Sequence, residues 1–217
     1  MTFSLAARCP DTGMFGVSVA SGSIAVGNRC PWVRAKVGAV LTQNCTDIRL
    51  GPLGLDLLAA GNSAEHTIAK LVSQSEFPTV RQIAVVDQLG RTSFYNGPDI
   101  GTINAGWQGE SCVAVGNTLS NPDVPRAMVR AFESTTEQPF AARLLAALDG
   151  GLAAGGEIRQ VRAAALLITD KMPWPIVDLR VDFQKDPCRS LRQLWEQYEG
   201  RIDFFITQVM RPHELDS

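Results

Sequence analysis

Apolar and polar positions alternate in several short stretches of the chain, and a period of two is typical of strands with one buried face. The first two stretches are 2–7 and 15–20, and the turn-forming sequence Pro-Asp-Thr-Gly separates them at 10–13. Two strands joined by so short a turn predict an antiparallel hairpin. Further strands are predicted at 36–43, 82–87, 92–96, 112–115, 163–169 and 176–183.

Other segments carry apolar residues three and four positions apart, which is the spacing of an amphipathic helix. Val124, Met128 and Phe132 follow this spacing. Helices are predicted at 51–60, 63–73, 123–133, 140–148 and 187–205. Antiparallel strand pairs followed by helices and then by more strands indicate a layered α+β fold. The 217 residues suit one domain, 1–217, which ends in the helix at about 187–205 and a short tail.

Composition and charge exclude several classes of protein. Hydrophobic residues make up 45% and charged residues 19% of the chain, which is typical of a folded protein and not of a disordered one. The 20 basic and 22 acidic residues nearly cancel and form no basic stretch, so we expect no nucleic-acid partner. No apolar run reaches the roughly 20 residues that span a bilayer, and no secretory signal is visible. We therefore expect no membrane partner and a cytoplasmic protein.

The cysteines and histidines limit the chemistry. The five cysteines are odd in number and include no Cys-x-x-Cys pair, which argues against a disulfide framework and a structural zinc site. The two histidines are His66, in a predicted helix, and His213, four residues from the end. Neither is close in sequence to a candidate nucleophile. We expect no metal and no cofactor, and an enzyme of this sequence would work without a histidine base.

The first hairpin brings two hydroxyl side chains together. If the turn occupies 10–13, the numbers of opposed residues add up to 23, so Thr2 faces Ser21 on the same side of the sheet. Removal of the initiator Met1 would leave Thr2 with a free amine beside its hydroxyl. This amine, with an ordinary pKa near 8, could take the proton of the hydroxyl. Threonine after methionine is also common in proteins without such a role.

Several segments together resemble one family of proteins. The resemblance to the uncharacterised DUF1028 family, in the group of N-terminal-nucleophile (Ntn) hydrolase-like proteins, rests on residues 2–8, 16–21, 25–27, 31–35, 37–43, 51–61, 116–119, 143–148, 155–156 and 178–182. It implies a four-layer αββα sandwich, with two stacked antiparallel sheets between layers of helices. It also implies that Thr2 is the nucleophile.

The chain departs from the family pattern at two places. Relatives typically carry Trp-Ala-Gly-His where residues 104–107 read Asn-Ala-Gly-Trp. Relatives often carry Gln-Ser-Ala-Ala-Leu where residues 162–166 read Arg-Ala-Ala-Ala-Leu. The polar residues missing at Trp107 and Ala163 would mean a changed substrate or a weakened site.

Four more residues are candidates for the site. Ser21 stands where proteasome-like relatives keep an acidic residue. Arg34 stands where they hold a cation, which would lower the pKa of the Thr2 amine and orient a substrate carboxylate; a surface salt bridge is the alternative. Gln43 ends a predicted strand and is a candidate for substrate binding. Asn117 could donate an amide N–H to an oxyanion, or it could serve a turn or a helix cap.

Two functions remain open from the sequence. The first is an Ntn-type amidohydrolase that cleaves a small amide-like C–N bond, with Thr2 attacking after Met1 has been removed. Its partner would be a small molecule, which Arg34 suggests carries a carboxylate. The alternative is a catalytically silent binding or assembly protein on the same fold, favoured by the departures at Trp107 and Ala163. We also expect a homo-oligomer.

Overall fold

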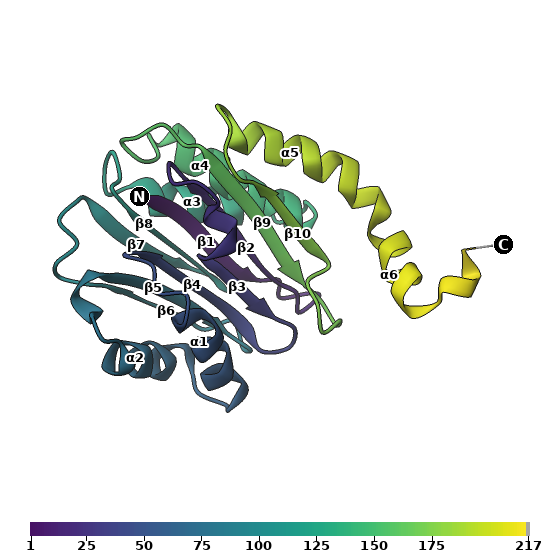
Figure 1. The fold of residues 1–217 in the computed structure, drawn as a ribbon, viewed down its shortest axis with the longest axis horizontal. Helices are drawn as coiled ribbons and strands as arrows, with labels where there is room; N and C mark the ends of the chain where they lie inside the picture. The colour runs from purple at the N-terminus through teal and green to yellow at the C-terminus, as the bar shows by residue number, and fades with distance from the viewer. Residues whose placement is uncertain (216–217) are drawn as a thin grey trace.

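Two antiparallel sheets form the centre of the protein, and the computed structural model describes residues 1–215 (Figure 1). The six-stranded sheet has the order β10 (Val177–Val181), β9 (Ala163–Thr169), β2 (Phe15–Ser21), β1 (Thr2–Arg8), β8 (Cys112–Asn117) and β7 (Asn104–Gly109). The four-stranded sheet has the order β3 (Pro31–Arg34), β4 (Gly38–Asn44), β5 (Arg81–Asp87) and β6 (Thr92–Asn96).

Helices cover the outer face of each sheet. The four-stranded sheet is covered by α1 (Leu50–Ala59) and α2 (Ala64–Gln74). The six-stranded sheet is covered by α3 (Val124–Glu133), α4 (Phe140–Ala153) and α5 (Pro187–Tyr198). The order of layers is therefore helix, sheet, sheet, helix, which confirms the predicted α+β sandwich (Figure 1).

The period of two in the strands explains how the layers pack. On β1, Ala6 faces the other sheet, whereas Phe3 and Leu5 face the helices α3 and α4. On β4, Leu41 likewise lies between the sheets. Buried apolar side chains therefore fill both sides of the six-stranded sheet, and the inner sides of the two sheets share one core.

Several boundaries differ from the prediction. The strands β3 and β7 were not predicted, because β3 is short and β7 has few of the residues that favour strands. The helix α4 continues to Ala153 through two glycines. A Cβ at Gly151 would lie 2.9 Å from Cγ of Met128, so a larger residue there would displace the Met128 side chain.

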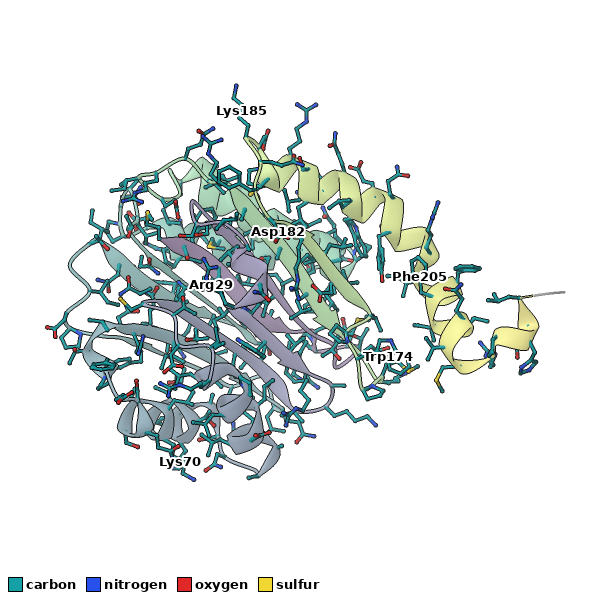
Figure 2. The ribbon with its side chains drawn as sticks, viewed as in Figure 1. Arg29, Lys70, Trp174, Asp182, Lys185 and Phe205 are labelled. Atoms are coloured by element: carbon teal, nitrogen blue, oxygen red, sulfur yellow. The ribbon has the colours of Figure 1, made fainter. Side chains whose placement is uncertain are left out.

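The single helix predicted at about 187–205 is wrong. The helix α5 ends at Tyr198, a 3-10 turn follows at Glu199–Arg201, and α6 spans Ile202–Met210. Figure 1 shows α6 projecting from the body, and Figure 2 shows Phe205 on this helix, away from the sheets. None of the residues of α6 is buried. Residues 216–217 of the predicted tail lie outside the described residues.

Candidate functional site

The space between the sheets is apolar along most of its length and becomes polar at one end. On β4 and β5, the side chains that face the other sheet change from Leu41 to Gln43 and from Ala84 to Gln82. The corresponding position on β8 changes from Val115 to Asn117. The buried residues at this end form what we call the polar cluster: Thr2, Ser4, Ser21, Gln43, Gln82 and Asn117.

The first hairpin has the predicted register. Phe3 pairs with Ala20, so the numbers of opposed residues add up to 23. The hydroxyl oxygens of Thr2 and Ser21 lie 3.3 Å apart. The carbonyl oxygen of Met1 accepts hydrogen bonds from both hydroxyls. The prediction that Thr2 begins a strand and contacts Ser21 is therefore confirmed.

An amide network lies directly beneath Thr2. Oε1 of Gln43 accepts a 2.7 Å hydrogen bond from Ser4, and Nε2 of Gln43 donates to Oε1 of Gln82 at 2.6 Å. The same Nε2 also lies 3.5 Å from the carbonyl oxygen of Thr2. The side chain of Gln43 thus lies at the limit of hydrogen-bond distance from the backbone of the candidate nucleophile. Its predicted contact with substrate stays a prediction.

Asn117 is held next to Thr2 by the pairing of β8 with β1. Its Nδ2 donates to Oε1 of Gln82 at 2.9 Å, and its Oδ1 is buried with no hydrogen-bond partner. Gln82 also donates from Nε2 to the carbonyl oxygen of Gly116 at 2.8 Å. Gln82 therefore joins the two sheets at the site. The predicted role of Asn117 toward an oxyanion stays a prediction.

Arg34 does not belong to the polar cluster. Its guanidinium pairs with Asp56 at 2.9 Å, and both side chains are exposed. Arg34 is paired with Gly38, which is five residues along β4 from Gln43. At about 3.3 Å per residue, this separates Arg34 from Gln43 by about 16 Å along the strand. The expectation that Arg34 faces Thr2 is wrong, and the alternative of a surface salt bridge is what the structure shows.

The family departures fall on different sides of the sheet. Trp107 pairs with Ala114, which faces the helices. The residue is 44% exposed, and the guanidinium of Arg126 lies over its ring. Ala163 pairs with Ser21, so it lies on the side of the sheet that carries the polar cluster. Of the two departures, only the one at Ala163 changes the immediate surroundings of Ser21.

Glu157 is a buried acid beside the site that the sequence did not single out. It follows Gly155 and Gly156 in the loop after α4, and its Oε1 accepts a 2.8 Å hydrogen bond from the backbone N–H of Gly22. Burial raises the pKa of this carboxyl to about 7. Burial also lowers the pKa of the amino group of Met1, and among charged groups Glu157 opposes this shift most strongly. Its only signal in the sequence is an acid after a double glycine.

Among residues 1–215, the remaining groups considered are the cysteines, possible metal ligands and possible membrane-spanning helices. All five cysteines are free, and Cys45 alone among them is exposed. Burial raises the pKa of Cys30 to about 11. Across residues 1–215, no three His, Cys, Asp or Glu side chains gather in a way that would hold a metal ion. No helix within the same range has the length and apolar character needed to cross a bilayer.

Comparison with known proteins decides the family. The model of a family described as "Family of unknown function (DUF1028)" matches residues 2–191. The chain belongs to the DUF1028 family. A DUF1028 protein of known structure, SPO2555 from Silicibacter pomeroyi, is 31% identical and has a TM-score of 0.84, over 90% of this chain and 88% of that one.

Two further structures are more distant from this DUF1028 protein. Anbu (ancestral beta-subunit) from Yersinia bercovieri is 10% identical, with a TM-score of 0.43, over 94% of this chain and 97% of that one. An Anbu (Gly-1) mutant from Hyphomicrobium sp. strain MC1 is 9% identical, with a TM-score of 0.45, over 91% and 94%. The comparison with curated proteins found no match. The DUF1028 match includes the polar cluster and Glu157, whereas α6 lies beyond it.

Proposed function

We propose that this DUF1028 protein is an Ntn-type amidohydrolase, with Thr2 as the nucleophile once Met1 has been removed. The observation that carries the proposal is the position of Thr2. This residue begins the central strand β1, its hydroxyl contacts Ser21, and its backbone lies next to the amide network. In a chain that starts at Met1, removal of this residue frees the Thr2 amine and uncovers the hydroxyl beside it.

The reaction divides into two steps with one base. In the first, Oγ1 of Thr2 attacks the carbonyl carbon of the substrate, and its proton passes to the Thr2 amine. The C–N bond then breaks, and the leaving nitrogen takes this proton, which leaves an ester on Thr2. In the second, water attacks the ester, the amine accepts a proton from the water, and the proton returns to Oγ1 as the acid is released. Ser21 and Gln43 keep Thr2 in place.

The substrate we propose is a small molecule with an amide-like bond. A preference for a carboxylate rested on Arg34, which lies elsewhere, so that part of the expectation loses its support. A homo-oligomer stays a proposal that sedimentation can test.

A catalytically silent binding or assembly protein is the second candidate. Two observations favour it: with Met1 in place only 5% of the surface of Thr2 is exposed, and Ala163 removes a polar position beside Ser21. Such a protein would leave Thr2 unreactive even with a free amine.

An acylation experiment separates the two candidates. Protein with and without Met1, distinguished by intact mass, is treated with an activated ester, and the modified residue is located by peptide mass spectrometry. We expect the Met1-free protein to form an ester on Thr2, which hydroxylamine cleaves, whereas an amide on the amine resists it. Thr2→Ala should lose this ester and Thr2→Ser should keep part of it, while Thr136→Ala, at an exposed threonine, should react like wild type. Equal ester formation with Met1 present, or none on a free Thr2, would overturn the hydrolase.

A further inference from the structure

Glu157 carries a buried carboxyl oxygen that has no donor. The residue is only 6% exposed, and Oε1 is occupied by the N–H of Gly22. Oε2 is buried and has no hydrogen-bond partner. A buried carboxylate oxygen is costly when it lacks a donor. A donor for this oxygen is therefore to be sought among the groups close to Glu157.

The backbone fixes Glu157 next to the polar cluster from two sides. Gly22, which donates to Oε1, directly follows Ser21. Glu157 also forms an isolated β-bridge with Leu119, and the N–H of Ile158 donates to the carbonyl oxygen of Thr118 at 3.0 Å. Thr118 directly follows Asn117. Both anchors of Glu157 are thus the chain neighbours of residues in the cluster.

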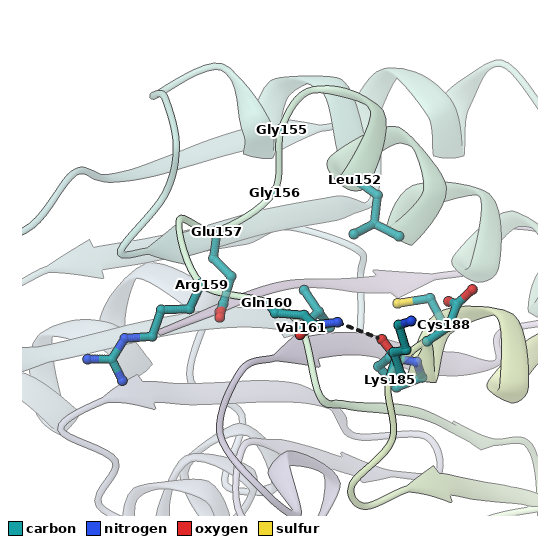
Figure 3. Close-up of a pocket in the computed structure, with 11 residues that line it drawn as sticks. Leu152, Gly155, Gly156, Glu157, Arg159, Gln160, Val161, Lys185 and Cys188 are labelled. Atoms are coloured by element: carbon teal, nitrogen blue, oxygen red, sulfur yellow. Dashed lines mark hydrogen bonds between the residues drawn. The ribbon is translucent and has the colours of Figure 1, made fainter.

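The cavity beside this loop does not account for Oε2. It has a volume of about 260 Å³ and is bordered by Glu157, Gln160, Lys185 and Cys188 among others. Figure 3 shows the Glu157 side chain descending from the loop, and the Arg159 side chain pointing away from the cavity. Nε2 of Gln160 donates a 3.3 Å hydrogen bond to the carbonyl oxygen of Lys185, which the dashed line in Figure 3 marks. Oε2 is closed off from solvent, so a molecule in the cavity would not meet it.

Two charged groups act on the carboxyl of Glu157, and one of them is the amino terminus. The groups that act on its carboxyl are the amino terminus and Arg159, and both favour the ionised form. The amino terminus in turn is acted on by Glu157, Cys30, Arg159 and Cys45, with Glu157 exerting the largest effect of any charged group. With Met1 present, this amine stands one residue too early to be the base of the reaction.

We propose that Glu157 is a positioning residue, whose Oε2 binds the amino group of Thr2 after Met1 has been removed. The inference rests on the proposed function. In the first step the proton moves from Oγ1 to the amine, and the carboxylate stays ionised and stabilises the ammonium that forms. Glu157 therefore holds the amine beside the hydroxyl without itself taking the proton.

The direct test is the pKa of the Thr2 amine in Met1-free protein, followed by ¹⁵N NMR. An opposite charge within about 4–6 Å shifts a pKa by roughly 1–3 units. In Glu157→Gln we therefore expect the amine pKa to fall by about 1 unit or more. Glu133→Gln is the matched control, because Glu133 also accepts a 2.8 Å bond from a backbone N–H, that of Glu110. The same amine pKa in wild type and Glu157→Gln would overturn the proposal.

A second measurement needs no variant. The carboxyl of Glu157 is titrated by ¹³C NMR in wild-type protein with and without Met1. We expect a lower carboxyl pKa without Met1, because the Thr2 ammonium lies closer; an unchanged pKa would overturn the proposal. Both readouts are independent of turnover. If the pKa values shift but Thr2 forms no ester, the hydrolase fails and only the contact between Glu157 and the Thr2 amine stands. If Thr2 forms an ester and no pKa shifts, the positioning role alone fails.

Discussion

Replacing Glu157 by Gln in the protein that keeps Met1 should remove a loss of stability that wild type undergoes as the pH rises through neutral. The amide of Gln can still accept the hydrogen bond from Gly22, so the loop after α4 keeps its anchor. The change removes a carboxyl that burial holds away from water. Wild type must ionise this group inside the folded protein as the pH rises, whereas the variant does not.

The size of this change in the free energy of unfolding follows from the pKa of the Glu157 carboxyl. Its pKa rises from 4.5 to about 7 on folding, so between these values the folded protein keeps a proton that the unfolded chain has released. The free energy of unfolding of wild type therefore falls as the pH rises through this window. At about 1.4 kcal/mol per pH unit, the loss approaches about 3 kcal/mol by pH 8.

Urea unfolding at pH 4 and pH 8 measures this difference. We expect the free energy of unfolding of Glu157→Gln, relative to wild type, to be higher at pH 8 than at pH 4 by about 3 kcal/mol. The control Glu133→Gln should follow wild type, because no comparable burial affects that carboxylate. Parallel curves for wild type and Glu157→Gln across this range would refute the reasoning.

Two further substitutions test the rest of the site. Gln82→Met keeps the size of the side chain but leaves buried donors of Gln43 and Asn117 unpaired. It should lower the free energy of unfolding, measured in urea, by about 2–4 kcal/mol. The control Gln108→Met, at an exposed position on β7, should change this free energy by less than about 0.5 kcal/mol. Arg34→Gln breaks only an exposed ion pair, so it should lower the free energy of unfolding by less than about 1 kcal/mol. Acylation of Thr2 should be unchanged in this variant, and a loss of acylation would return Arg34 to the site.

Local pattern was sufficient for the part of the site that one hairpin builds. The four-residue turn fixes the register of β1 and β2, and a register of 23 puts Thr2 beside Ser21 with no reference to the rest of the fold. The same alternation explains why Phe3 and Ala6 lie on opposite faces of β1. These features depend on neighbours in sequence, so the sequence alone predicts them.

Contacts between residues of the two sheets could not be predicted from the local sequence pattern. Gln43 and Gln82 lie opposite each other at one end of the pair β4 and β5. Their location under Thr2 depends on how the four-stranded sheet stacks on the six-stranded sheet. The position of Arg34 depends on the register within the four-stranded sheet. Arg34 ends β3 opposite Gly38, which begins β4, whereas Gln43 lies near the other end of β4. Glu157 comes from a loop, where no periodicity gives the direction of a side chain.

A buried carboxyl that lowers stability at neutral pH calls for a reason beyond the fold. A scaffold that served only to bind or assemble would avoid this pH-dependent loss with Gln at position 157, which makes the same hydrogen bond to Gly22 without a charge. The cost is greatest while Met1 is present, because no donor then reaches Oε2. A Thr2 ammonium would supply this donor and lower the pKa of the carboxyl, so removal of Met1 should reduce the stabilising effect of Glu157→Gln at pH 8. If Glu157 positions the Thr2 amine as proposed, the loss of stability in the Met1-bearing form and the positioning would have one physical origin. The same urea titration on Met1-free protein tests whether they are linked.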